Sequence, residues 1–266
     1  MVTKLTQLKR WQNESKVPFS NNQGFKESYV ISKYLEDPLL IGGKKFDLRI
    51  YVLVTSYRPL KVYLYDLGFA RFCVEKYSND MTERDNMFIH LTNVAIAKQA
   101  ANYNDKHGGK WTIANLKFYL EQTQGKAACE KCFDEINNII YVSLKAVQNV
   151  VINDKHCFEL YGFDVLIDAQ LKPWLIEVNA SPSLSTTTEV DRQIKMNLIN
   201  DVYRIVIPPD WGEDNNKRGT NTCRDDHVGF FNTIIDESAQ NGGTTDKNGK
   251  KVPGFGSKKQ GTQLWK

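Results

Sequence analysis

The stretch GFDVLIDAQLKPWLIEVNASPSL, residues 162–184, alternates apolar and polar side chains on both sides of a short turn. Successive side chains of a strand point to opposite faces of its sheet, so the alternation predicts two strands. The turn DAQLKP is short enough to make them antiparallel neighbours. One face is apolar and must pack on a core; it carries Phe163, Val165, Ile167, Trp174, Ile176 and Val178. The other face carries Asp164, Leu166, Asp168, Leu175, Glu177 and Asn179.

This second face allows two interpretations. A hairpin with one core side and one solvent side explains the acids, but Leu166 and Leu175 favour a covered face. Uncompensated carboxylates on a covered face are costly, and a bound cation is the usual remedy. Carboxylate and amide oxygens suit Mg²⁺, which also takes water and nucleotide phosphates as ligands. The oxygen-bearing side chains that form this candidate Mg²⁺–nucleotide site are Asp164, Glu177 and Asn179.

A second pattern, GGKKFDLRIYVLV, places Lys45, Asp47 and Arg49 on one face of a predicted strand. The opposite face is apolar and carries Phe46, Leu48 and Ile50. The charged row is typical of a solvated edge strand, where charges deter aggregation, and it also suits phosphate binding. Arg71, in GFARFC, fits a phosphate or carboxylate ligand as well as a structural ion pair.

Two shorter motifs carry weaker signals. HLTN, with His90 and Asn93, ends an expected strand, and both side chains are by default satisfied turn residues. SKYL, with Lys33, ends another expected strand or presents backbone groups and a lysine to a base.

The whole chain has 266 residues, of which 41% are hydrophobic and 25% charged, enough for a substantial core. Besides the hairpin, we expect strands over 28–35 and 46–57, a hairpin over 60–75, and helices over 113–122, 130–152 and 191–206. Thr112 is the expected N-cap of the first helix. The fold class is therefore α+β, with mixed strands and flanking helices.

Composition changes after residue 206. Gly, Asn, Asp, Thr and Lys dominate residues 207–266, so we expect a disordered tail there. Residues 241–266 hold six lysines against one aspartate, and the tail is the expected point of attraction to an acidic polymer. No apolar run is long enough to cross a bilayer, and the first residues lack a secretory signal. Five cysteines, an odd number, fit a reducing cytosol, and CEKC fits a helical thiol pair.

Five motifs resemble, in order, those of the tubulin-tyrosine-ligase-like family: KKFDLRIYVLV, GFARFC, HLTNVAI, HCFELYGFDVLID and KPWLIEVNASPSL. The resemblance covers residues 5–206 and is closest to the tubulin polyglutamylase branch. It implies an ATP-grasp fold, in which ATP lies between two α+β lobes. The start, MVTKLTQLKRW, is similar to the segment after the family's phosphate-binding Gly-rich loop. We therefore expect a partial catalytic region over 1–206, the carboxy-terminal portion of the fold without its amino-terminal lobe.

The resemblance also implies roles for individual residues. It places the metal ligands at Asp164, Glu177 and Asn179. It places the adenine hinge and nucleotide contacts at Lys33, Tyr34, Lys45 and Asp47. It places cations near the γ-phosphate and the reacting carboxylate at Arg49 and Arg71. It places the floor of the site at His90 and Asn93.

The implied activity is ATP- and Mg²⁺-dependent addition of glutamate to side-chain carboxylates of tubulin, through an acyl phosphate. Alternatives are a tubulin glycylase or tyrosine ligase of the same fold, or a non-catalytic microtubule-binding subunit without the phosphate lobe. The expected partners are tubulin or microtubules, glutamate as co-substrate and accessory protein subunits, with neither nucleic acid nor membrane. The expected location is the cytoplasm and cytoskeleton, including the cilium axoneme, basal body or centriole.

Overall fold

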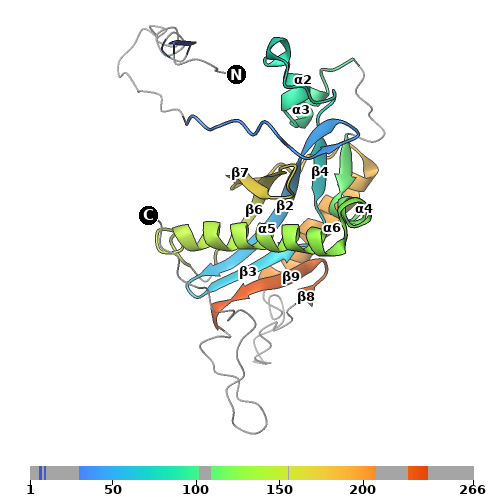
Figure 1. Cartoon of the computed structure of the whole chain (residues 1–266). Coiled ribbons are helices and arrows are strands. Elements are labelled where there is room, and N and C mark those ends of the chain that lie inside the picture. The colour runs from blue at the N-terminus through green and yellow to red at the C-terminus, as the bar shows by residue number, and fades with distance from the viewer. Residues whose placement is uncertain are drawn as a thin grey trace, which may run out of the picture.

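The computed structural model describes residues 30–101, 109–154, 156–207 and 227–238, together with residues 6, 7 and 9 (Figure 1). The basic segment 241–266 and Cys223 lie outside the described residues. Figure 1 shows α5 (Lys126–Val147) crossing in front of a large sheet, with α6 (Glu189–Val206) behind it. None of the described helices is long and apolar enough to cross a bilayer.

One nine-stranded sheet is built around the long strand β2, Lys44–Tyr57. Half of its residues are β-branched or aromatic, which favours a strand. The other strands are β1 (Leu40–Ile41), β3 (Leu60–Tyr65), β4 (Phe69–Phe72), β5 (Lys110–Thr112), β6 (Glu159–Ile167), β7 (Pro173–Asn179), β8 (His227–Val228) and β9 (Phe231–Asp236). Every strand pairing among the described residues is antiparallel, where mixed strands were expected. The α+β class is confirmed.

The helices cover both faces of this sheet. Their bounds are η1 (Met81–Glu83), α2 (Met87–His90), α3 (Val94–Ala97), α4 (Ile113–Gln124), α5 and α6. Thr112 caps α4 as predicted, because its hydroxyl accepts a hydrogen bond from the backbone N–H of Asn115. Cys129 and Cys132 are a buried helical thiol pair on α5, which confirms that prediction for CEKC.

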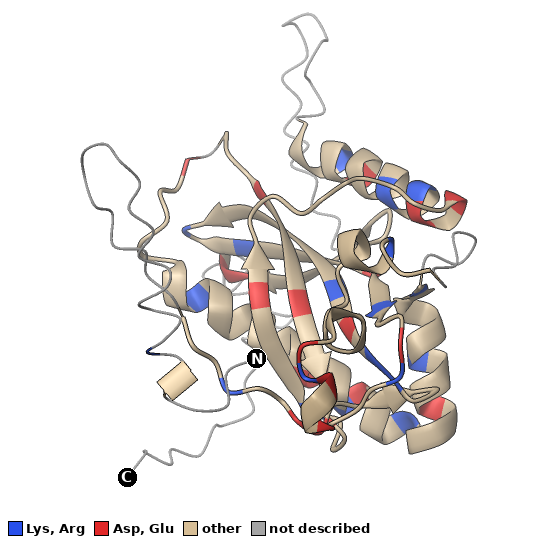
Figure 2. Cartoon of the chain, turned by 90° about the horizontal axis from the view of Figure 1, so that it is seen from above, with Lys and Arg blue, Asp and Glu red and all other residues tan. Residues whose placement is uncertain are grey.

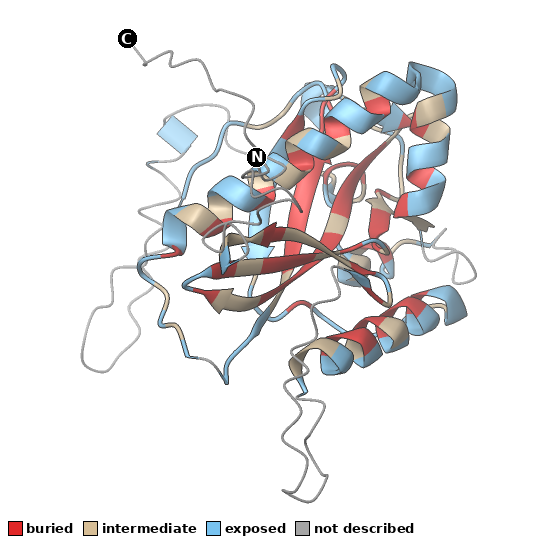
Figure 3. Ribbon diagram, turned by 90° about the horizontal axis from the view of Figure 1, so that it is seen from below, coloured by how far each residue is buried: buried red, intermediate tan, exposed pale blue. Residues whose placement is uncertain are grey.

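Two apolar cores lie between the sheet and the helices on its two faces (Figure 3). Helices α4 and α5 pack on the face of β2 that carries Phe46, Leu48 and Ile50. Burial of a side chain such as Ile140, which is fully buried in this core, contributes about 1.5–3 kcal/mol. Helix α6 packs on part of the opposite face, over Tyr51. The charged row of β2 shares that second face but lies beyond this second core, toward the start of the strand.

Several local predictions were wrong. Residues 60–75 do not form a hairpin, because β3 and β4 both pair with β2, one after the other along the same edge. HLTN does not end a strand; His90 is the last residue of α2. Residues 30–35 of the expected strand 28–35 form no strand, since no neighbouring strand pairs with them in the described part of the chain. Residues 28 and 29 lie outside the described residues.

The hairpin of β6 and β7 is antiparallel as predicted, but its alternation is interrupted. Asp164 pairs with Glu177, whereas the next pair is Val165 with Leu175, so Ile176 is an additional residue on β7. The bulge places Leu175, rather than Ile176, opposite Val165. The prediction of one apolar face through Trp174, Ile176 and Val178 was therefore wrong. On the edge strand β7 these three side chains are exposed instead of packed on a core.

The expected disordered tail contains structure at residues 227–238. There β8 and β9 extend the sheet by pairing β9 with β3. Phe231 is fully buried against Tyr65, with ring centroids 4.7 Å apart. No strand was predicted for the apolar residues of this short segment, because its pairing depends on a partner far away in the sequence.

The β8–β9 turn supplies a stability prediction. Gly229 has a φ of +60° and lies against Asp201 of α6, whose carboxylate accepts a hydrogen bond from the Phe230 N–H at 3.0 Å. A Cβ at position 229 would overlap that carboxylate. We expect Gly229→Ala to lower the free energy of unfolding by roughly 2–4 kcal/mol in urea denaturation. Gly42→Ala is the matched control, because Gly42 has the same φ but open space around it. Equal losses in both variants would contradict a role for the Asp201 contact.

Candidate active site

The charged face of β2 forms the centre of the candidate site. Cross-strand register places Asp164 of β6 beside Arg49 on one side of β2, and Arg71 of β4 beside Asp47 on the other. Figure 2 shows acidic positions side by side on neighbouring strands, with a basic position next to them. The solvated-edge interpretation of this row is wrong, because β2 is central and Lys45 and Asp47 are each only 8% exposed.

Arg49 forms a bidentate pair with Asp164. Its Nε donates to Oδ1 at 2.6 Å and its Nη2 donates to Oδ2 at 3.0 Å. Gly162 makes this geometry possible, because a Cβ there would lie 3.1 Å from Cδ of Arg49 and 2.8 Å from Cβ of Pro182. The planar guanidinium is therefore held flat across the hairpin.

Arg71 joins the two carboxylates of the site. It donates to Asp47 from Nε at 2.8 Å and from Nη2 at 2.5 Å, and Nη2 also lies 2.9 Å from Oδ2 of Asp164. Burial raises the pKa of Asp164, but its hydrogen bond to Arg49 and the charge of Arg71 outweigh burial, so the pKa lies below its usual range. The Asp164 carboxylate is therefore held ionised beside two fixed cations. Thr92 completes the arrangement by donating from Oγ1 to Asp47 at 2.7 Å.

The candidate metal ligands lie together on one face of the hairpin. Glu177 is the direct cross-strand neighbour of Asp164. Nδ2 of Asn179 lies 3.2 Å from Oε1 of Glu177 and 3.4 Å from Oδ2 of Asp164. Among the described residues no three His, Cys, Asp or Glu side chains form a metal-binding group, and this set has two carboxylates and an amide. Its oxygen chemistry fits Mg²⁺, which takes few protein ligands and completes its shell with water and phosphate.

A second cluster surrounds Lys45. Its Nζ donates to the hydroxyl of Tyr34 at 3.2 Å and to the backbone carbonyl of His90 at 3.1 Å. The Nε2 atom of His90 lies 3.1 Å from the carbonyl of Glu83, which accepts only, so Nε2 carries the proton. Nδ1 then accepts from Tyr34 at 2.9 Å. Burial lowers the pKa of His90 and of Lys45, so His90 is a neutral hydrogen-bonding residue here.

Three polar residues singled out from the sequence lie outside these clusters. Lys33 is exposed on an extended segment, and none of its contacts in the described part of the chain reaches the site. Asn93 is exposed and precedes α3, where its carbonyl accepts from Ile96 and Ala97. Asp168 organises the hairpin turn by accepting from the backbone N–H of Gln170 and Lys172 and from the indole of Trp174.

Thr92, Gly162 and Lys110 also belong to this arrangement, although the sequence did not single them out. Thr92 stands between the two polar residues of HLTN that were considered, and only the fold turns it toward Asp47. Gly162 opens the hairpin motif, where glycine in a strand is a signal of close approach. Lys110 is the cross-strand neighbour of Arg71.

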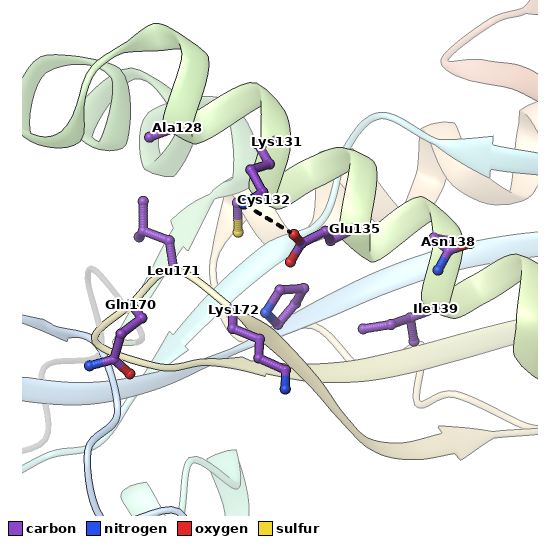
Figure 4. Close-up of a pocket in the computed structure, with 10 residues that line it drawn as sticks. Ala128, Lys131, Cys132, Glu135, Asn138, Ile139, Gln170, Leu171 and Lys172 are labelled. Atoms are coloured by element: carbon purple, nitrogen blue, oxygen red, sulfur yellow. Dashed lines mark ion pairs between the residues drawn. The ribbon is translucent and has the colours of Figure 1, made fainter. Parts of the chain in front are cut away.

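A cavity of about 660 Å³ lies away from these residues (Figure 4). It is formed between α5 and the turn from β6 to β7, on the side of the sheet that α5 covers. Its polar side chains include Lys131 and Glu135, an exposed pair one helical turn apart at 3.8 Å. None of the residues that line it belongs to the charged clusters, so the geometry of the clusters, rather than cavity size, identifies the candidate site.

The antiparallel sheet with helices on both faces is an α+β architecture, consistent with the ATP-grasp type of fold that the family resemblance implies. The sequence model of the tubulin-tyrosine ligase family matches residues 1–215, and the chain belongs to this family.

The chain is similar to three family members whose names include tubulin polyglutamylase. The chain is 55% identical over 240 residues to "Probable alpha-tubulin polyglutamylase Ttll1" of Tetrahymena thermophila, covering 90% of this chain and 58% of that protein. It is 49% identical over 180 residues to "Probable tubulin polyglutamylase TTLL9" of Rattus norvegicus, covering 68% and 39%. It is 40% identical over 199 residues to "Tubulin polyglutamylase TTLL5" of Homo sapiens, covering 70% and 16%. The chain thus spans 58% or less of the length of each.

Proposed function

We propose that this chain carries the catalytic sheet of a tubulin polyglutamylase, an ATP-dependent ligase that adds glutamate to tubulin. The main support is the site in which Arg49 and Arg71 hold Asp164 beside Glu177, within a chain whose relatives are named tubulin polyglutamylases. The resemblance of its motifs to those of the family supports ATP-dependent ligation as the class of reaction. The proposed reaction needs no protein nucleophile.

The reaction has two steps. A carboxylate oxygen of a tubulin glutamate attacks the γ-phosphorus of ATP, ADP leaves, and an acyl phosphate forms. The amine of the incoming glutamate attacks the acyl carbon, phosphate leaves, the nitrogen loses a proton, and an isopeptide bond results. Negative charge develops on the transferred phosphoryl group and on the tetrahedral intermediate. Arg49 and Arg71, already fixed by their carboxylate partners, stabilise that charge without reorganising.

The remaining residues divide between nucleotide and metal. Lys45 and Asp47 contact the nucleotide, and Tyr34, which lies next to Lys45, contacts the adenine together with Lys33. His90 orients Tyr34 and Lys45 through the contacts described above. Asp164, Glu177 and Asn179 would hold two Mg²⁺ ions, which neutralise and orient the phosphates when bound.

The same fold also supports the addition of glycine or tyrosine, and it supports a non-catalytic microtubule-binding subunit. Tubulin is the common substrate or partner in each case. We propose glutamate because all three relatives carry polyglutamylase names. We further propose that the protein acts on the cytoskeleton, including the cilium axoneme, basal body or centriole, with accessory subunits.

The test is incubation of the full-length gene product with microtubules, ATP, Mg²⁺ and equal concentrations of glutamate, glycine and tyrosine. Mass spectrometry of the tubulin tails distinguishes the added residues by their masses. Glutamate addition that stops when ATP is omitted supports the proposal. Exclusive addition of glycine or tyrosine contradicts it, and microtubule binding without either nucleotide binding or any addition supports the non-catalytic alternative.

A further inference from the structure

A buried charged cluster lies next to the site and has no role in the reaction described above. Lys110 of β5 and Lys195 of α6 both contact Asp191, near the start of α6. Lys110 Nζ donates to Oδ2 of Asp191 at 2.7 Å, and Lys195 Nζ lies 3.0 Å from Oδ1. Asp191 is completely buried, and both lysine side chains are at most 10% exposed. We call Lys110, Asp191 and Lys195 the α6 clamp.

Register connects this clamp to the site. Asp47, Arg71 and Lys110 are successive cross-strand neighbours on β2, β4 and β5, so their side chains share one row on one face. The candidate metal ligands lie on β6 and β7, across β2 from this row. Across the site the strands follow the order β7, β6, β2, β4, β5. The metal ligands lie on β7 and β6, and the clamp lies at the opposite end, on β5.

The clamp also holds the loop that follows Asn179. Asp191 Oδ2 accepts from the backbone N–H of Thr187 at 3.0 Å, and Lys110 donates to the Thr187 hydroxyl at 3.2 Å. Lys195 donates to the carbonyl of Ser185. At its other end the loop is fixed by Pro182, packed on Gly162. Most loop side chains are exposed, so these few contacts define its path.

A cluster built only for stability would be an expensive choice at this position. Removing two ammonium groups and a carboxylate from water costs several kcal/mol per ion, and apolar residues of similar size often stabilise as well or better. The hydrogen bonds and charges of the two lysines outweigh the burial that raises the pKa of Asp191, so its pKa is lowered and the carboxylate is ionised. The cluster instead fixes the position of β5, the strand beside Arg71, and of the loop after Asn179.

We propose that Asp191, together with Lys110 and Lys195, is a positioning residue for the amino-acid side of the site. It fixes the loop 180–188 and the strand beside Arg71. Through these contacts it affects binding and reaction of the incoming amino acid but not binding of the nucleotide. Of the proposed nucleotide contacts, Tyr34 and Lys45 lie beyond Asp47 toward the start of β2, and Asp47 is separated from Lys110 of the clamp by Arg71. This inference rests on the proposed ligase function.

The test compares Asp191→Asn with Asp201→Asn in the full-length gene product. Both aspartates are buried on α6, but Asp201 bonds the β8–β9 turn instead of the site. We expect Asp191→Asn to raise KM for glutamate about 10-fold and to lower kcat about 10-fold, with KM for ATP changed less than 2-fold. Asp201→Asn should leave all three constants within about 2-fold. Equal effects of the two variants, or an equal rise in KM for ATP, would overturn the proposal.

Two further measurements keep the test decisive if Asp191→Asn folds poorly. Lys195→Met removes the contacts of Lys195 with Asp191 and with the Ser185 carbonyl but keeps the carboxylate paired with Lys110. It should raise KM for glutamate, without changing KM for ATP, to a smaller extent than Asp191→Asn. Amide hydrogen exchange of residues 180–188 should accelerate in both variants and remain unchanged in Asp201→Asn. If the parent protein ligates no amino acid, the proposed function fails, and the exchange result alone decides the clamp: unchanged exchange overturns it.

Discussion

Replacing Glu177 by Gln is expected to lower the rate of tubulin ligation by about 100-fold or more while leaving the fold intact. The exchange of one oxygen for a nitrogen removes the negative charge and one hard ligand atom but keeps size and shape. Glu177 is exposed on the edge strand β7, and its described hydrogen bond is to Asn179. Little packing or pairing therefore depends on its charge.

The measurement is the initial rate of ATP-dependent glutamate incorporation, together with thermal unfolding of the same preparation. Glu159→Gln is the matched control, because Glu159 is an exposed glutamate at the start of β6 in the same hairpin. We expect unchanged melting temperatures in both variants and loss of activity only at position 177. Full activity in Glu177→Gln would remove Glu177 from the metal site.

Replacing Arg71 by Lys should reduce both activity and stability, even though the positive charge remains. Arg71 uses Nε and Nη2 to bind Asp47 and reaches Asp164 with the same Nη2 atom. A single ammonium group cannot hold this two-carboxylate geometry. We expect ligation to fall about 100-fold and the free energy of unfolding to fall by about 1–3 kcal/mol.

Incorporation rates and urea denaturation measure the two effects separately. Arg192→Lys is the control, because Arg192 forms an exposed pair with Glu189 on α6 and should tolerate the exchange in both assays. Loss of stability without loss of activity would assign Arg71 a structural role alone. Retention of both would contradict the inferred geometry.

Much of the fold can be predicted from local patterns. The apolar face of β2, the hairpin of β6 and β7, and the Thr112 cap of α4 were all predicted, because each depends on side-chain period or on neighbouring residues. The β7 bulge at Ile176 was not predicted, since an inserted residue leaves no mark in the composition of a strand. The strand β9 was not predicted, because its partner β3 lies more than 150 residues earlier in the sequence.

In the site, too, some features follow from local patterns and others depend on distant parts of the chain. The sequence by itself determined which side chains share a strand face: Lys45 with Asp47 and Arg49, and Asp164 with Glu177 and Asn179. Side-chain alternation is a local property of the backbone, so it can be read without a structure.

Only the tertiary structure decided which of these strand faces lie side by side and which further residues join them. Cross-strand register paired Arg49 with Asp164 and Asp47 with Arg71, and it brought Lys110 beside Arg71. Helix packing then placed Asp191 against Lys110 across 81 residues of sequence. These contacts depend on which strands become neighbours and where α6 docks. Long-range packing decides both, and no local pattern encodes it.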